Sequence, residues 1–211
     1  PRDLKKHIKA LQTVREKIIV FAPTVEEMYH DKTVSEKFEY DGLEFQMEGK
    51  HRPGHFDGVG TIVKRLLEII QPTFAYFGEK DFQQLQIVKK MVQKHHLPVV
   101  IVGCPIFREN NGLAMSSRNE RLSVTERNEA GFIYKTLLIA KEKFGTKSTN
   151  EIKKWVQNTF QQHPMFALEY FEIANEATLE PIQRKSKDKK YRAFIAVFVN
   201  NVRLIDTILL N

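Results

Sequence analysis

The sequence predicts an α/β fold followed by a smaller α+β unit. Two short apolar runs, residues 74–77 and 99–102, are bounded by turn residues and flank a helical apolar pattern at residues 82–92. A strand, a helix and a second strand joined by short connections predict parallel strands with a right-handed crossover. Farther along, helical patterns precede apolar or alternating segments, an order that suggests a separate α+β domain. We place the boundary so that residues 1–106 form the first domain and residues 107–211 the second.

The remaining elements of the first domain follow from the spacing of apolar residues. Apolar side chains recur at helical spacing over residues 4–14, which predicts an amphipathic helix. Residues 18–21 are a continuous apolar run that ends before a proline, and they are expected to form a buried parallel strand. Residues 34–49 mix charges and aromatic rings around an Asp-Gly pair and are expected to be irregular. A second helical face covers residues 59–70.

The second domain begins with a helix signal. Ser123 and Glu126 have the spacing of a capping box, so a helix is expected to begin there and to run to about Phe144. Another helix is expected around Trp155, and the pair Asn200–Asn201 is a plausible hairpin turn. The predicted strands are residues 167–174, 192–199 and 202–209.

Composition places the chain among globular proteins that bury a core. Of 211 residues, 42% are hydrophobic and 28% are charged. No apolar run approaches the roughly 20 residues of a membrane span, and no secretory signal is recognised, so we expect no membrane partner. The single cysteine, Cys104, predicts a reducing compartment, and we expect a cytoplasmic protein. A small buried hydrophobic residue is a better interpretation of Cys104 than a nucleophile.

The formal charge of +7 and the pI of about 9.4 favour an anionic partner, either nucleotide phosphates or nucleic acid. The densest basic run, residues 184–190, is most simply a solvated connection between two strands. Aromatic residues do not interleave with this run, as a groove for single-stranded nucleic acid would favour. We therefore expect no nucleic-acid partner.

Residues 78–81, Gly-Glu-Lys-Asp, lie where a predicted parallel strand ends and a helix begins. Ligands bind at this edge of open α/β sheets, and a helix start offers free N–H groups to a phosphate. Gly78 allows a ligand to approach the backbone closely, and Lys80 supplies a point charge. Asp81 can accept a bond from a ribose hydroxyl or hold a hydrated metal ion. A simple glycine turn with a charged first helical turn explains the spacing equally well.

Three other polar positions can contribute to the same site. Gln84 follows Asp81 near the same helix face, where its amide can bind an acidic substrate, although a surface glutamine is the simpler interpretation. Arg52 and His55 flank a Pro-Gly turn and can neutralise an anion and carry a proton, although a polar loop packed on the next helix is at least as good an explanation. No Cys/His spacing resembles a zinc site.

Residues 115–119, Met-Ser-Ser-Arg-Asn, place two hydroxyl groups and a guanidinium group close together after an Asn-Gly pair. Such a segment can donate several hydrogen bonds to a phosphate chain. Ser117 or a neighbouring residue is equally suited to cap a helix. Composition alone leaves both interpretations open.

Three long blocks, in this order along the chain, strongly resemble the pantothenate synthetase family. They are RPGHFDGVGTIV at 52–63, QPTFAYFGEKDFQQL at 71–85 and IVGCPIFRENNGLAMSSRNERLS at 101–123. A weaker resemblance extends over almost the whole chain, from its Pro-Arg-Asp-Leu start to residues 203–206. The resemblance implies a Rossmann-like nucleotidylyltransferase domain, a smaller C-terminal α+β domain that closes over ATP as a lid, and a homodimer.

The resemblance also implies a reaction in the synthesis of the coenzyme A precursor pantothenate. In this family the pantoate carboxylate attacks the α-phosphate of Mg-ATP, which gives pantoyl adenylate and pyrophosphate. The amine of β-alanine then attacks the adenylate, which gives pantothenate and AMP. ATP and Mg²⁺ are therefore the expected cofactors, and pantoate and β-alanine the expected substrates of a pantoate–β-alanine ligase.

Site residues are carried over by position. Gln84 matches the pantoate-binding glutamine, Arg52 and His55 match a polar loop at the rim of the active site, and Asp81 is a possible metal ligand. The expected catalytic positions are Lys80, Ser116, Ser117 and Arg118. The expected ATP-binding positions are Gly78, Glu79, Lys80, Asp81, Phe107, Met115, Ser116, Ser117 and Arg118, with Phe107 placed where a backbone contact reaches the adenine.

One departure from the family pattern is large. The family begins with a strand, a Pro-Thr-Met-Gly turn and a His-x-Gly-His motif that contributes the catalytic histidine, and this motif does not occur in the sequence. His55 is not expected to replace it. We therefore expect that these 211 residues alone do not perform the full reaction, and that the absent part leaves an exposed sheet edge or apolar patch.

Two alternatives to a pantothenate synthetase are kept. Another nucleotidylyltransferase of the same superfold would share the fold but not the substrate, and Gln84 and the block at residues 52–63 speak against it. A non-catalytic module that binds anions or nucleic acid would use the positive charge, and its affinity would fall steeply with salt and ignore ATP.

Overall fold

The computed structural model describes residues 4–14, 17–29 and 34–211 of the chain. Contacts divide the chain into two compact units, Pro1–Ser35 and Glu36–Asn211. No helix in the described ranges is long and apolar enough to cross a membrane.

The first unit contains two short helices, α1 (Leu4–Gln12) and α2 (Val25–Tyr29). The helix predicted for the start of the chain is confirmed. The strand predicted at residues 18–21 is wrong, because this run has no regular secondary structure and pairs with no strand among the described residues of its unit. A strand depends on a neighbouring strand for its backbone hydrogen bonds, and without that neighbour the apolar side chains stay exposed, Ile19 at 96%.

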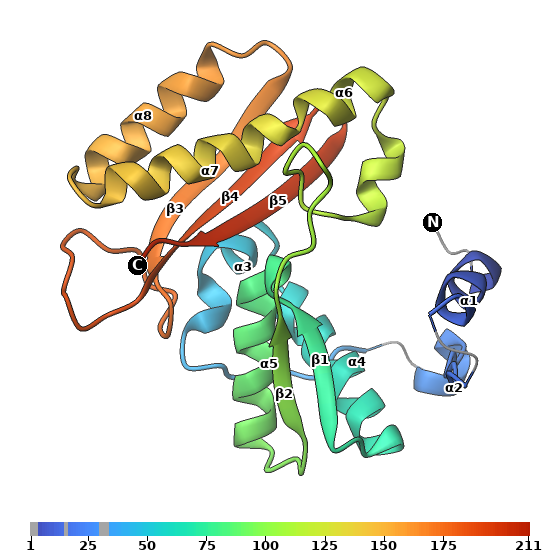
Figure 1. Cartoon of the computed structure of the whole chain (residues 1–211). Helices are drawn as coiled ribbons and strands as arrows, with labels where there is room; N and C mark the ends of the chain where they lie inside the picture. The colour runs from blue at the N-terminus through green and yellow to red at the C-terminus, as the bar shows by residue number, and fades with distance from the viewer. Residues whose placement is uncertain (1–3, 15–16, 30–33) are drawn as a thin grey trace. The chain divides into compact units, whose positions relative to one another are not determined.

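The second unit begins with a layer built on two parallel strands, as predicted (Figure 1). Phe74 pairs with Val100 and Gly78 with Cys104, so both strands end at the same edge. Helices α4 and α5 pack against each other, and the apolar side chains between them and the sheet form one core cluster. The elements of this layer are η1 (Leu43–Phe45), α3 (Met47–His51), α4 (His55–Ile70), β1 (Phe74–Gly78), η2 (Glu79–Asp81), α5 (Phe82–Lys94) and β2 (Val100–Cys104).

The irregular region predicted at residues 34–49 holds a 3₁₀ turn and the start of a short helix, and the structure assigns no strand to residues 34–49. The two strands also expose apolar side chains. Phe74 is 52% exposed, Tyr76 67% and Val100 53%.

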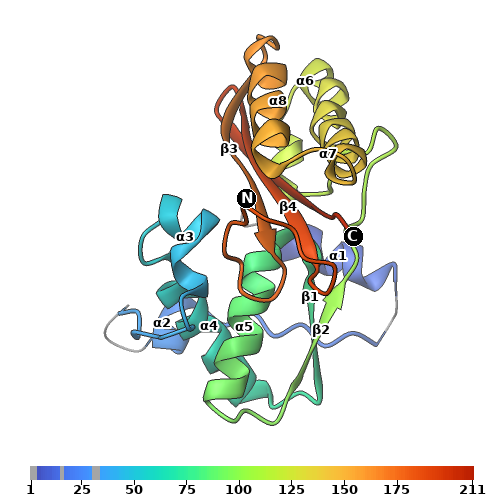
Figure 2. The ribbon, with the colours of Figure 1, turned by 90° about the vertical axis from the view of Figure 1, so that its left-hand side faces the viewer.

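A second layer follows, in which three helices lie on one face of an antiparallel sheet ordered β3-β4-β5 (Figures 1 and 2). Val199 pairs with Val202, so the predicted two-residue turn at Asn200 and Asn201 is confirmed, and Asn200 has a φ of 48° as such a turn requires. The elements of this layer are η3 (Ser117–Arg121), α6 (Val124–Glu129), α7 (Gly131–Phe144), α8 (Thr149–Gln161), β3 (Phe166–Asn175), β4 (Tyr191–Val199) and β5 (Val202–Leu209).

The capping box at Ser123 and Glu126 is confirmed, but the helix that it begins is interrupted at Ala130. Gly131 lies at this break because the chain passes very close there. A Cβ atom at Gly131 would come within 2.4 Å of the carbonyl oxygen of Asn111. The loop before η3 is therefore packed directly onto the start of α7.

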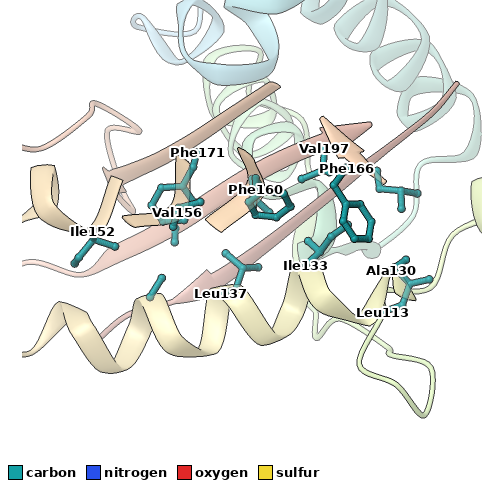
Figure 3. Packing of buried hydrophobic residues seen from close by; sticks show 14 of the residues in the cluster. Leu113, Ala130, Ile133, Leu137, Ile152, Val156, Phe160, Phe166, Phe171 and Val197 are labelled. Carbon is teal, nitrogen blue, oxygen red and sulfur yellow. The ribbon is translucent and has the colours of Figure 1, made fainter. Parts of the chain in front are cut away.

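The core of this layer is continuous from the helices to the sheet (Figure 3). Leu137 of α7 and Val156 of α8 are fully buried and point toward Phe171 and Val197 of the sheet. The basic run at residues 184–190 is an exposed connection between β3 and β4, as predicted. This packing gives the sheet a rigid support, and polar side chains of β3 and β5 line the cavity described next.

Candidate active site

A cavity of about 190 Å³ lies within the second unit, between the end of β1, the turn before α4 and the strands β3–β5. Six of the residues singled out in the sequence line it, although they come from three separate segments of the chain. They are Arg52, His55, Lys80, Asp81, Gln84 and Arg118.

Lys80 lies in the 3₁₀ turn η2 that joins β1 to α5. Burial lowers the pKa of its ammonium group, and Arg118 lowers it further, while Asp81 and Asp206 act in the opposite direction. Within residues 36–211 no hydrogen bond or ion pair engages the Lys80 Nζ atom. A partly desolvated cation without a partner is suited to receive an anionic ligand.

Two adjacent glutamines on α5 have different environments. The side chain of Gln83 is buried, donates to the carbonyl oxygens of Leu43 at 2.8 Å and Gln46 at 2.9 Å, and accepts from the backbone N–H of Glu48 at 2.9 Å. Gln84 is half-buried and lines the cavity. Gln83 therefore holds the segment before α4 in place, while Gln84 offers its amide to a ligand.

Arg52 and His55 are brought together by a tight turn in which Gly54 has a φ of 76°. The Arg52 Nη1 atom lies 3.2 Å from His55 Nε2. Burial, followed by the charge of Arg52, lowers the pKa of the His55 imidazole. His55 is also the first residue of α4, where the helix dipole disfavours a positive charge. Both effects favour the neutral form of the ring.

A network of charged side chains beside this turn was not found from the sequence. Arg203 of β5 donates to both carboxylate oxygens of Glu48, at 2.9 and 2.7 Å, and also to Glu169 of β3. The hydroxyl group of Tyr170 donates to Glu48 at 2.8 Å. Burial acts to raise the pKa of Glu48, but the hydrogen bonds from Arg203 and Tyr170 outweigh it and hold the pKa below its ordinary value.

The segment after β2 is tied to the sheet by a buried ion pair. Arg108 donates to both carboxylate oxygens of Asp206 on β5, at 2.6 and 3.0 Å, and its guanidinium group lies 3.6 Å from the centre of the Tyr134 ring. The carbonyl oxygen of Phe107 accepts from the N–H of Met115 at 2.9 Å. These contacts close the segment into a hairpin-like loop that keeps the side chains of Phe107 and Met115 exposed, at 75% and 50%.

The Ser-Ser-Arg segment begins the 3₁₀ helix η3. Ser116 is its N-cap, and the Ser116 hydroxyl oxygen accepts from the N–H of Arg118 at 3.2 Å. Asn119 is buried and donates to the Glu109 carboxylate at 2.7 Å, which anchors the turn. Arg118 reaches the cavity, whereas Ser117 is exposed beside it. The cap interpretation is thus correct for Ser116.

Gly78 and Glu79 do not reach the cavity with their own atoms. A Cβ atom at Gly78 would meet nothing within 4 Å, so the space in front of this backbone is open to a ligand. The Glu79 carboxylate lies 3.7 Å from Arg192 and faces a separate depression on the other side of α5. Arg192 is paired more closely with Glu176, at 2.7 Å.

The cavity is lined by opposite charges in close proximity. Its four cationic side chains are Arg52, Lys80, Arg118 and Arg203, and its three carboxylates are Glu48, Asp81 and Asp206. Glu48 is paired with Arg203, and Asp206 is paired with Arg108, which lies outside the cavity lining. The cavity therefore retains a net positive charge. A volume of about 190 Å³ is small beside the ~300–1,000 Å³ of typical drug-sized ligand sites and suits a small organic acid.

No group of three or more His, Cys, Asp or Glu side chains that could hold a metal ion occurs in the part of the chain that the structure describes. Mg²⁺ does not require such a group, because it is often held by one or two carboxylates together with substrate phosphates. Asp81 is exposed at the cavity and fits this mode of binding. Cys104, at the end of β2, is a free and half-buried thiol that lies outside the cavity lining.

Comparison with solved structures defines the class of the fold. Pantothenate synthetase from Thermus thermophilus superposes with a TM-score of 0.90 at 38% identity, over 100% of this chain and 75% of that one. Pantoate-beta-alanine ligase from Francisella tularensis, complexed with beta-gamma ATP and beta-alanine, superposes with a TM-score of 0.77 at 30% identity. It is matched over 100% of this chain and 71% of its own. The chain therefore has a nucleotidylyltransferase-type α/β fold.

Comparison of sequences identifies the family. A pantothenate synthetase from Flavobacterium psychrophilum is 64% identical over 99% of this chain and 74% of the relative. One from Christiangramia forsetii is 54% identical over 100% of this chain and 75% of the relative. The family profile described as Pantoate-beta-alanine ligase matches residues 1–209. The chain belongs to the pantoate–beta-alanine ligase family, a family of ATP-dependent ligases, and it spans about three quarters of the length of these relatives.

Proposed function

We propose that this chain takes part in the ATP-dependent condensation of pantoate with β-alanine. The observation that carries the proposal is the meeting of Arg52, His55, Lys80, Gln84 and Arg118 at one cavity. This set combines cations for carboxylate and phosphate groups with an amide for a hydroxyl or carboxylate group. Family membership supports the same reaction.

The chemistry proceeds by two nucleophilic attacks, and the protein contributes position and charge. Gln84 binds pantoate in the cavity and orients its carboxylate toward the α-phosphate of ATP. Lys80 and Arg118 stabilise the negative charge that develops on the transferring phosphate, and N–H groups near Ser116 and Ser117 add to this. Pyrophosphate leaves, and the amine of β-alanine then attacks the acyl carbon and releases AMP. Two bound reactants gain rate from their fixed orientation.

The nucleotide extends from the cavity over the open backbone at Gly78 and toward the exposed loop at Phe107 and Met115. In this placement residues 78–81 contact the phosphates. Glu79 contributes only its backbone, because its carboxylate faces Arg192. ATP at the site is supported by the beta-gamma ATP named for the Francisella tularensis relative. Mg²⁺ held by Asp81 and the phosphates would supply further neutralisation of charge.

We also propose a domain division, an oligomeric state and a cellular compartment. Residues 107–211 form a lid domain that closes over ATP bound to residues 1–106, and the protein acts as a homodimer in the cytoplasm. The second unit has two apolar cores, one formed only by residues after 107 and the other mostly by residues before it, which supports a division near this position. Ala174, Leu179 and Phe194 belong to the earlier core and join the two parts. Small-angle scattering with and without ATP tests closure and the size of the assembly together.

A pyrophosphate-release assay on the native protein tests the reaction. With ATP and pantoate, and without β-alanine, release of pyrophosphate is expected, because adenylation precedes amide formation. Release that requires a different acceptor would assign the chain to another nucleotidylyltransferase activity. Binding that ignores ATP and falls steeply with salt would indicate the non-catalytic alternative.

A further inference from the structure

Glu48 has an unusual position between the antiparallel sheet and the turn before α4. Its side chain is 13% exposed and accepts three hydrogen bonds, two from Arg203 and one from Tyr170. The Oε2 atom, which faces Arg203, also lies 3.8 Å from the Nη1 atom of Arg52. Glu48 therefore connects strands β3 and β5 with an arginine of the cavity.

Arg52 in turn determines which nitrogen atom of His55 carries the proton. A guanidinium group is always protonated and only donates, so the Nε2 atom of His55, 3.2 Å from Arg52 Nη1, must accept. A neutral imidazole that accepts at Nε2 carries its hydrogen atom on Nδ1. In peptides in water neither nitrogen is fixed in this way, so the contact with Arg52 selects one tautomer.

We propose that Glu48 is a positioning residue that holds Arg52 so that His55 presents its Nδ1–H as a donor to the carboxylate of a small acid bound in the cavity. Arg203 and Tyr170 hold Glu48. The charges of Arg52 and Arg203 act to lower the pKa of His55, and those of Glu48 and Asp81 act to raise it. His55 in this arrangement is a neutral hydrogen-bond donor and does not transfer a proton. The identity of the acid as pantoate or β-alanine rests on the proposed function. The tautomer of His55 rests only on its contact with Arg52.

Ring-labelled ¹⁵N-histidine NMR of the native protein tests the tautomer without any need for activity. The expected result at neutral pH is a protonated Nδ1 and an unprotonated Nε2 at His55. In Glu48→Gln an amide NH₂ replaces an oxygen atom near Arg203 and Arg52, so Arg52 loses its ion pair with the Glu48 carboxylate. Arg52 is then no longer held against His55, and the Nδ1–H preference at His55 should be lost. A protonated Nε2 in the wild-type ring would overturn the proposal.

Glu169→Gln is the matched control, because Glu169 also accepts from Arg203 but has no contact with Arg52. The tautomer preference should persist in this variant. In kinetics, Glu48→Gln should raise the KM of one acid substrate about tenfold, as expected for loss of one charge-assisted hydrogen bond, with KM for ATP changed less than about twofold. Equal effects in both variants would mean that Glu48 acts only as part of the scaffold, and would overturn the proposal.

Arg52→Met provides a second route if Glu48→Gln does not fold, since the Arg52 side chain is 45% exposed and its truncation is tolerated more easily. This variant should lose the Nδ1–H preference, and its retention would contradict the proposal. If the native protein releases no pyrophosphate with pantoate, the proposed function fails, while the ring resonances still report the tautomer. The two failures are therefore distinguishable.

Discussion

Lys80→Met tests whether the partly buried cation serves the ligand or the fold. Methionine retains most of the length of the side chain and removes the charge. Burial lowers the pKa of Lys80, which means that the folded state binds this proton less tightly than the unfolded chain does. The charged ammonium group therefore destabilises the folded state at neutral pH. The variant should therefore unfold at the same temperature as the wild type or at a higher one.

Adenylation should respond in the opposite direction. A preorganised donor at a developing negative charge typically contributes about 100- to 1,000-fold to the rate, or about 2.7–4 kcal/mol. Lys80 has no hydrogen bond or ion pair within residues 36–211 that would compete for its charge, so the full effect is expected on pyrophosphate release at saturating substrates. Lys80→Arg, which keeps the charge, should retain more of the rate. Turnover in Lys80→Met equal to that of the wild type would refute the role, as would a loss of rate explained by unfolding in thermal melts.

Three further predictions concern the fold. Leu137→Ala removes a side chain that is 0% exposed in the core of the second layer, and should lower the free energy of unfolding by about 2–5 kcal/mol in urea titrations; a loss below about 1 kcal/mol would mean that this core is poorly packed. Ser148→Ala removes the cap of α8 and should cost about 1 kcal/mol, measured in the same way, whereas the exposed Ser117→Ala should cost almost nothing. The ion pair with Arg127 holds the pKa of Glu109 below its ordinary value, so its contribution to stability is present above about pH 4.5 and is lost as the pH falls through the lowered pKa. The difference in melting temperature between Glu109→Gln and the wild type should shrink over that range, and a difference that persisted in acid would contradict the assignment.

Local patterns were sufficient for most of the fold. Apolar runs bounded by turns predicted β1 and β2, and the helical pattern between them predicted parallel pairing. The capping box at Ser123 and the turn at Asn200 were also correct, because both depend on side-chain and backbone preferences within four residues. The run at residues 18–21 has the same apolar pattern but no strand beside it among the residues of its unit that the structure describes. Whether a run forms a strand therefore cannot be decided from its own residues alone.

The lining of the cavity was predictable where its residues lie at or near element ends, as Lys80, Gln84 and Arg118 do, whereas their roles stay a prediction. Glu48 and Arg203 are 155 residues apart and meet only through the packing of α3 against the antiparallel sheet, so no spacing in the sequence could pair them. The available signal was the presence of Arg203 and Asp206 within an otherwise mostly apolar strand, where charges are costly unless paired. Gln83 and Gln84 could not be separated by sequence because their roles depend on which face of α5 is covered.

The central claim is that a carboxylate bound in this cavity attacks the α-phosphate of ATP. The most direct measurement uses pantoate labelled with ¹⁸O in its carboxyl group, incubated with ATP, β-alanine and the native protein, followed by mass spectrometry of the products. The amine displaces AMP from the adenylate, so one ¹⁸O atom should appear in the phosphate of AMP and one should remain in the amide carbonyl of pantothenate. Label in inorganic phosphate, with ADP as the nucleotide product, would indicate attack at the γ-phosphate and would contradict the mechanism.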